Sequence, residues 1–137
     1  MYALGKPGTA DFVVRVRRQG GTWKWIGYGG CRPRVVVDGL EATSWRLASK
    51  TLDPGTRKVS VTFITGECAR FERAEVTTTA SAVTITVFLR TIPPTPPADA
   101  CAGVGSTSRR EVALTEPLGR RALLDGGTMP AEMVRPK

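Results

Sequence analysis

The chain has 137 residues, with 20 Lys plus Arg against 12 Asp plus Glu and no His, which gives a formal net charge of +8. This length supports one modest hydrophobic core, and a hydrophobic fraction of 41% is well above that of a disordered chain. Because His is absent, the sequence excludes Ser-His-Asp and Cys-His catalysis and the usual zinc sites.

Neither a membrane-spanning segment nor a signal peptide is visible in the sequence. The longest apolar stretches, such as residues 35–37 and 87–89, are far shorter than the ~20 residues that a spanning helix needs. Residues 1–10 hold one Lys and no apolar run of ~7 residues, so we expect a flexible N-terminal segment. Either the protein is intracellular or a leader was removed from it.

Alternation of apolar and polar residues predicts short β-strands through the first half of the chain. Residues 12–17 alternate, Gly20-Gly21 predicts a turn, and the aromatic-rich run 23–28 completes a hairpin. A further strand is predicted over 34–37, followed by the turn dipeptide Asp38-Gly39.

The next predicted strands are one short segment and two long ones. The segment 44–48 would place Trp45 and Leu47 on one side, and residues 59–64 alternate clearly. Residues 74–79 are rich in β-branched side chains, and a hairpin would join them to the alternating run 83–89.

After residue 90 the alternating strand pattern is interrupted by prolines. The Pro-rich stretch 92–97 cannot donate to a strand ladder, which predicts an extended crossover loop. Alternation returns at 111–115, where Val112 and Leu114 face one way, and an apolar pair stands at 123–124. Residues 127–137 are Pro-rich and charged, so we expect a disordered tail.

These elements predict an all-β fold. Seven to eight short strands with frequent turns and no useful helix favour an antiparallel, immunoglobulin-like β-sandwich over residues 11–126, with a small β-barrel as the alternative. A repeat of fixed period is not visible, which disfavours a propeller or a solenoid.

The three cysteines, Cys31, Cys68 and Cys101, lack the paired spacing of a zinc or redox motif. A structural disulfide is the more economical use, and it implies an oxidising compartment. If the strands at 59–65, 74–79 and 83–90 run up, down and up, Cys68 and Cys101 lie at the same end, so we predict a Cys68–Cys101 disulfide. The alternative is three buried, reduced thiols.

Basic residues concentrate in the N-terminal part of the chain. Residues 1–58 carry 11 Lys plus Arg and four acids, a balance of +7, whereas residues 59–137 carry nine and eight, a balance of +1. Candidate anion-binding residues beside the aromatic run are Arg15, Arg17, Lys24, Arg32 and Arg34. The plainer interpretation is that these side chains form the polar outer face of a sheet, and that the tryptophans pack in its core.

Catalysis finds little support in the sequence. Carboxylate pairs occur only at close spacing, as in Glu72 and Glu75, and a cysteine nucleophile would have no His base. We therefore expect no enzyme activity, no cofactor and no metal.

Several motifs carry a resemblance to known sequences. They are Gly-Gly-Cys-Arg-Pro-Arg at 29–34, Leu-Asp-Pro at 52–54, Glu-Cys-Ala at 67–69, the run 83–87, and Glu-Pro-Leu-Gly with Leu-Leu-Asp-Gly at 116–126. In this order they resemble a family of uncharacterised actinobacterial secreted proteins and lipoproteins. The resemblance implies an exported, C-terminal-type β domain and leaves a Cys31–Cys68 pairing open. A lipid-acceptor leader is absent, and Arg120 stands where an acidic residue often follows Pro-Leu-Gly.

The sequence thus leads to two functional hypotheses. The first is an exported, secreted or cell-surface, non-enzymatic β domain that serves as an envelope accessory or binding module, with an unknown envelope ligand or protein as partner. The second is a basic protein that binds an anionic polymer such as nucleic acid, or a virion structural protein, in a reducing cytosol.

Overall fold

A computed structural model describes residues 2–3, 13–19, 22–29, 35–94 and 100–136. Side chains are described for Thr22 and for residues 35–94 and 100–136. The chain divides into two compact units, Met1–Pro33 and Arg34–Lys137. The sequence predicts one domain over 11–126, whereas the hairpin predicted near the N-terminus lies in the first unit and pairs within a sheet of its own.

The first unit contains the predicted N-terminal hairpin. Strands β2 (Val13–Gln19) and β3 (Thr22–Gly29) pair antiparallel, and β1 (Tyr2–Ala3) adds to the free edge of β2. The pairing shifts by one residue between Arg15 and Val16, which marks a β-bulge. Tyr2 and Ala3 therefore form a strand within the segment predicted to be flexible.

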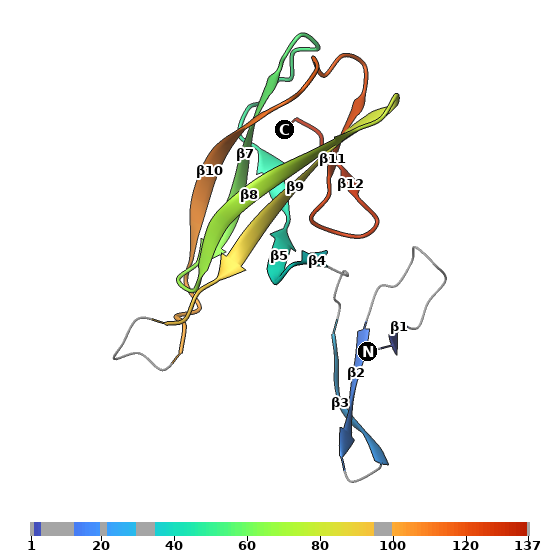
Figure 1. Cartoon of the computed structure of the whole chain (residues 1–137), viewed down its shortest axis with the longest axis vertical. Coiled ribbons are helices and arrows are strands. Elements are labelled where there is room, and N and C mark those ends of the chain that lie inside the picture. The colour runs from blue at the N-terminus through green and yellow to red at the C-terminus, as the bar shows by residue number, and fades with distance from the viewer. Residues whose placement is uncertain (1, 4–12, 20–21, 30–34, 95–99, 137) are drawn as a thin grey trace. The chain divides into compact units, whose positions relative to one another are not determined.

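The second unit is all-β, as predicted, and its described part contains no helix (Figure 1). The four long strands are β7 (Lys58–Gly66), β8 (Ala69–Thr78), β9 (Ala82–Thr91) and β10 (Gly105–Ala113). The short strands are β4 (Val36–Val37), β5 (Leu40–Thr43), β6 (Trp45–Leu47), β11 (Ala122–Asp125) and β12 (Glu132–Met133).

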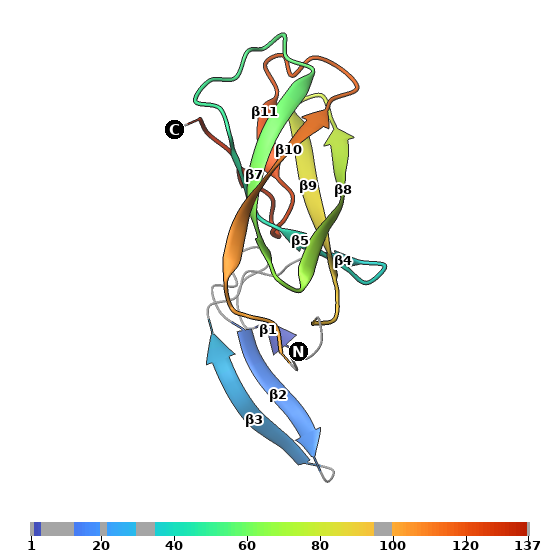
Figure 2. The ribbon, with the colours of Figure 1, turned by 90° about the vertical axis from the view of Figure 1, so that its left-hand side faces the viewer.

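These strands form two sheets. One has the order β10-β7-β6, and the other has the order β12-β11-β9-β5-β4, with β8 on the opposite edge of β9. Most pairs are antiparallel, but β11 runs parallel to β9 with Leu123 opposite Val83. The predicted antiparallel sandwich therefore contains one parallel pair. In Figure 2 the β4–β5 hairpin extends from the side of the unit.

The core lies between the two sheets and follows the predicted alternation. Val59, Val61 and Phe63 point inward from β7, while Val83, Ile85 and Val87 point inward from β9. Each of these side chains is at most 2% exposed. The cluster is completed by Trp45, Val112, Leu114, Leu118 and Leu123. Val112 and Leu114 thus face one way, as the sequence predicts.

Contacts to an aromatic ring on β8 join this strand to β7 and β10 of the other sheet. The rings of Phe63 and Phe71 lie 5.8 Å apart, and the guanidinium of Arg110 lies 5.1 Å from the centre of the Phe71 ring. Arg110 thereby shields Phe71 from water at this side of the sandwich.

Turn residues account for the hairpins. Asp38 and Gly39 both have positive φ, 52° and 75°, as a two-residue type I′ turn between β4 and β5 requires. The predicted β8–β9 hairpin closes where Thr79 N–H donates to the carbonyl oxygen of Ala82. Strand β10 begins at Gly105, six residues before the start predicted at 111. The prediction missed this first part of the strand because its exposed Ser, Thr and Arg residues lack an alternating apolar pattern.

The C-terminal segment is more ordered than the sequence predicts. Strand β12 pairs with β11, Val134 N–H donates to Leu123 O, and Thr128 is buried. Residues 132–134 therefore extend the second sheet, although the Pro-rich, charged composition of 127–137 predicts disorder.

The predicted disulfide between Cys68 and Cys101 is confirmed, with Cα atoms 5.7 Å apart. Cys68 occupies the β7–β8 turn, and Cys101 lies in the connection from β9 to β10. Both connections lie at the same end of the long strands, as strand directions predict. Cys31, the alternative partner, lies outside the described residues.

Candidate ligand-binding surface

A row of polar side chains crosses the outer face of the β10-β7-β6 sheet. Arg46 on β6 is directly opposite Thr62 on β7, and Thr62 is directly opposite Arg109 on β10. Directly opposed residues share a face of a sheet, and here the neighbours Val61 and Phe63 occupy the buried face. The Thr62 hydroxyl also donates to Arg46 O at 3.2 Å. We call Arg46, Thr62 and Arg109 the arginine row.

A second row, of mixed character, lies beside the first. Ile64 on β7 is opposite Thr107 on β10, and Ile64 is 58% exposed. A Cβ atom added at Gly105 would lie 2.5 Å from Cγ2 of Ile64, so the Ile64 side chain leans across this glycine. The exposed apolar side chain of Ile64 thus lies beside the arginine row.

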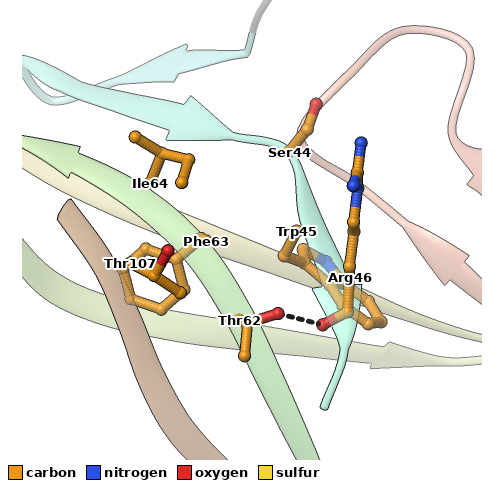
Figure 3. A pocket seen from close by; sticks show the side chains of 7 residues that line it. All are labelled: Ser44, Trp45, Arg46, Thr62, Phe63, Ile64 and Thr107. Atoms are coloured by element: carbon orange, nitrogen blue, oxygen red, sulfur yellow. Dashed lines mark hydrogen bonds between the residues drawn. The ribbon is translucent and has the colours of Figure 1, made fainter. Parts of the chain in front are cut away.

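Two neighbouring hollows meet at Arg46. The first, of about 470 Å³, lies between the start of β6 and the outer face of β7, and Figure 3 shows Arg46 and Ile64 on either side of it. The second, of about 520 Å³, lies between β6 and the C-terminal segment and reaches Asp125 and Arg135. Ser44, Trp45, Arg46 and Thr62 line both hollows. Volumes in this range fit small ligand groups.

In the described part of the chain both arginines of this row are unpaired, whereas two of the three arginines on β8 and β9 are paired with carboxylates. Within the described residues, neither Arg46 nor Arg109 has a carboxylate partner, while Glu111 on the same face is paired with Lys58 at 2.7 Å. On β8 and β9, Arg73 contacts Glu75 at 2.7 Å and Arg90 contacts Glu72 at 2.7 Å, while Arg70 has no carboxylate partner in the described part of the chain. The arginine row therefore carries uncompensated positive charge.

Asp125, which lines the second hollow, is a buried carboxylate with a structural role. Its oxygens accept hydrogen bonds from Trp45 N–H at 3.1 Å and from Gly127 N–H at 2.8 Å. Burial raises the pKa of Asp125 above its ordinary value of 3.8, although hydrogen bonds from Gly127, Trp45 and Ser44 act in the opposite direction. This carboxylate therefore fixes the main chain at the junction between β5 and β6.

Three of the five candidate anion-binding residues from the sequence lie on the described strands of the first unit. Arg15 and Arg17 lie on β2 and Lys24 on β3, and the strand register places Arg17 opposite Lys24. Arg32 and Arg34 lie outside the described residues. The predicted cluster is therefore represented in the structure by one cross-strand basic pair.

Sequence reasoning missed the arginine row. The alternation at 44–48 already places Arg46 on the face opposite Trp45 and Leu47. Arg109 gave no such signal, because the apolar pattern of β10 begins only at Val112. Trp45, in contrast, is 4% exposed and packs in the core as expected.

The described residues contain no cluster of metal-ligating side chains, and the two carboxylates singled out in the sequence are paired with arginines. A group of three or more His, Cys, Asp or Glu residues suited to a metal ion does not occur in them. Glu72 and Glu75, the carboxylates singled out in the sequence, are each engaged by an arginine.

No family model, curated protein or solved structure matches the chain. The described residues also include no helix long and apolar enough to cross a membrane.

Proposed function

We propose that the chain is an exported, non-enzymatic β domain that serves as a binding module at the cell surface or in the cell envelope. The observation that carries this proposal is the disulfide between Cys68 and Cys101. Disulfides form and persist in oxidising compartments, whereas the cytosol keeps thiols reduced.

The position of the disulfide supports a structural rather than a catalytic role. It closes a loop of 33 residues and ties the β7–β8 turn to the long connection that precedes β10. Glu67, next to Cys68, accepts a hydrogen bond from Ala102 N–H at 2.9 Å, so the same two connections also meet beside the disulfide. A small domain exported into an oxidising compartment gains stability from such a link.

A binding role is supported by the open arginine row. Strand-rich scaffolds carry binding groups on exposed faces and connections, and this face holds two arginines that have no carboxylate partner among the described residues and lie beside two hollows. The motif resemblance to secreted actinobacterial proteins points to the same compartment. Together these features favour an envelope binding module over an enzyme.

Fractionation of the native cells tests the proposal. Intact cells are treated with a protease that does not enter them, and the protein is followed with an antibody beside a known cytosolic protein. The proposal predicts that the protein is found in the medium or is degraded while the cytosolic protein survives. Protection of both proteins, with release only on lysis, would contradict export.

A second candidate function has one observation in its favour. The register of β2 and β3 places Arg17 opposite Lys24, and both strands belong to the more basic part of the chain. A basic hairpin of this kind favours binding to nucleic acid in the cytosol. Tight binding to duplex DNA that weakens steeply with salt, and that is lost in Arg17→Ala/Lys24→Ala, would support it.

A further inference from the structure

We propose that the arginine row of Arg46, Thr62 and Arg109 binds an anionic polysaccharide. The inference rests on the proposed function, because it names the ligand class of the same binding module. It assigns the contact to the outer face of the β10-β7-β6 sheet and not to the basic residues of β2 and β3.

Charge complementarity is the first argument for this ligand. Arg46 and Arg109 are exposed and have no carboxylate partner among the described residues, and the one carboxylate of this sheet face, Glu111, is paired with Lys58. The guanidinium group binds carboxylates and phosphates through two parallel hydrogen bonds. An anionic ligand would therefore find two such groups free without breaking an existing ion pair.

The spacing of the row is the second argument. Arg46 and Arg109 stand on the outer strands with β7 between them, so their backbones are separated by two strand spacings, about 10 Å. A chain with repeated charges can contact the two guanidinium groups with separate anionic groups at this spacing. The row therefore favours a polymer over a single small anion.

The groups between and beside the arginines suit a carbohydrate. Thr62 lies between the two arginines, Thr107 lies in the neighbouring row, and Ser44 borders both hollows, so hydroxyl groups face the same surface as the charges. Ile64 adds an exposed apolar surface against which the apolar face of a sugar ring packs. Hydroxyls, cations and one apolar side chain are together the chemistry that an anionic sugar chain requires.

Single-stranded nucleic acid fits this surface less well. Such ligands are bound by aromatic side chains on which successive bases stack. The aromatic residues that line the hollow, Trp45 and Phe63, are only 4% and 2% exposed and belong to the core. This surface therefore offers charge and hydroxyl groups without a stacking platform.

The test measures binding of the full chain to immobilised polygalacturonate, with uncharged dextran and a duplex DNA as the comparison polymers. The variant Arg46→Ala/Arg109→Ala removes both arginines of the row. The matched control, Arg70→Ala/Arg120→Ala, removes two exposed arginines that also have no carboxylate partner in the described part of the chain. Both variants lose the same net charge, and thermal unfolding verifies that each remains folded.

We expect polygalacturonate to bind more tightly than dextran, with an affinity that falls as salt is added. The variant Arg46→Ala/Arg109→Ala should bind polygalacturonate about tenfold more weakly, because two exposed charge contacts of ordinary strength contribute about this much. The control variant Arg70→Ala/Arg120→Ala should lose much less affinity. Equal losses in both variants would show a bulk charge effect and overturn the assignment. Preference for DNA, or no binding to polygalacturonate, would overturn the ligand class, whereas export is judged separately by the protease experiment.

Discussion

The main-chain N–H of Trp45 donates a hydrogen bond to the carboxylate of Asp125, which lies 80 residues further along the chain. The Trp45 side chain adds a second link, because its ring N–H donates to Ile85 O at 2.8 Å. Trp45 begins β6 in one sheet, while Asp125 and Ile85 belong to the other. This pair of bonds joins the two sheets at the corner beside both hollows.

The first prediction concerns this buried carboxylate. Asp125→Ala leaves the N–H groups of Trp45 and Gly127 without their acceptor, and we expect the free energy of unfolding to fall by about 3 kcal/mol in urea denaturation. Asp53→Ala is the matched control, because Asp53 accepts a bond from Gly55 N–H on the surface and should lose about 1 kcal/mol or less. Equal effects of the two substitutions would contradict the structural role of Asp125.

A second prediction follows from the raised pKa of Asp125. The folded protein holds a proton on this carboxyl more readily than the unfolded chain does. The carboxyl therefore favours the folded state below pH 3.8, and this contribution is lost as the pH rises through the raised pKa. Relative to Asp125→Asn, the wild-type protein should lose unfolding free energy between pH 3 and pH 7. A wild-type advantage that grows over this range would show that the pKa is lowered instead.

The third prediction concerns the glycine that follows this corner. A Cβ atom at Gly127 would collide with the carbonyl oxygen of Thr43, and a backbone atom has little room to move. We expect Gly127→Ala to lower the free energy of unfolding by about 2 kcal/mol or more. At Gly66 nothing lies within 4 Å of the added atom, so Gly66→Ala should stay within about 0.5 kcal/mol of the wild type. Similar losses at both glycines would disprove the close approach.

The fourth prediction concerns the contribution of the disulfide to stability. The disulfide closes a loop of 33 residues and so restricts the unfolded chain. Its removal in Cys68→Ser/Cys101→Ser should therefore lower the free energy of unfolding by about 3–4 kcal/mol. A reducing agent should bring the wild-type protein to the same level and leave the variant unchanged. A reducing agent that lowers the stability of both proteins equally would mean that the loss has another cause.

The local alternation of apolar and polar residues, together with the turn residues, was sufficient to predict most of the long strands. Alternation in 59–64 and 83–89 predicted the two central strands, and Asp38-Gly39 predicted the turn that joins β4 to β5. Strand direction alone brought Cys68 and Cys101 to one end. These features are encoded by neighbouring residues, which is why one sequence reveals them.

Features that depend on distant contacts were not predictable. The parallel pairing of β11 with β9 and the addition of β12 depend on contacts between segments that are far apart in the sequence or follow an irregular connection. The arginine row needs Arg46 and Arg109 to be brought together through β7, and no local pattern specifies that neighbour. The charge excess at the N-terminus drew attention to β2 and β3 instead.

The measurement that tests the central claim most directly is a tryptic map of the protein, isolated from its native cells with free thiols blocked and without reduction. Trypsin places the three cysteines on separate peptides, Cys31 on 25–34, Cys68 on 59–70 and Cys101 on 91–109. An exported domain predicts that 59–70 and 91–109 appear as one linked peptide that separates on reduction. If both peptides instead carry the blocking group, the cysteines are reduced in the cell, and the proposal of an exported binding module is contradicted.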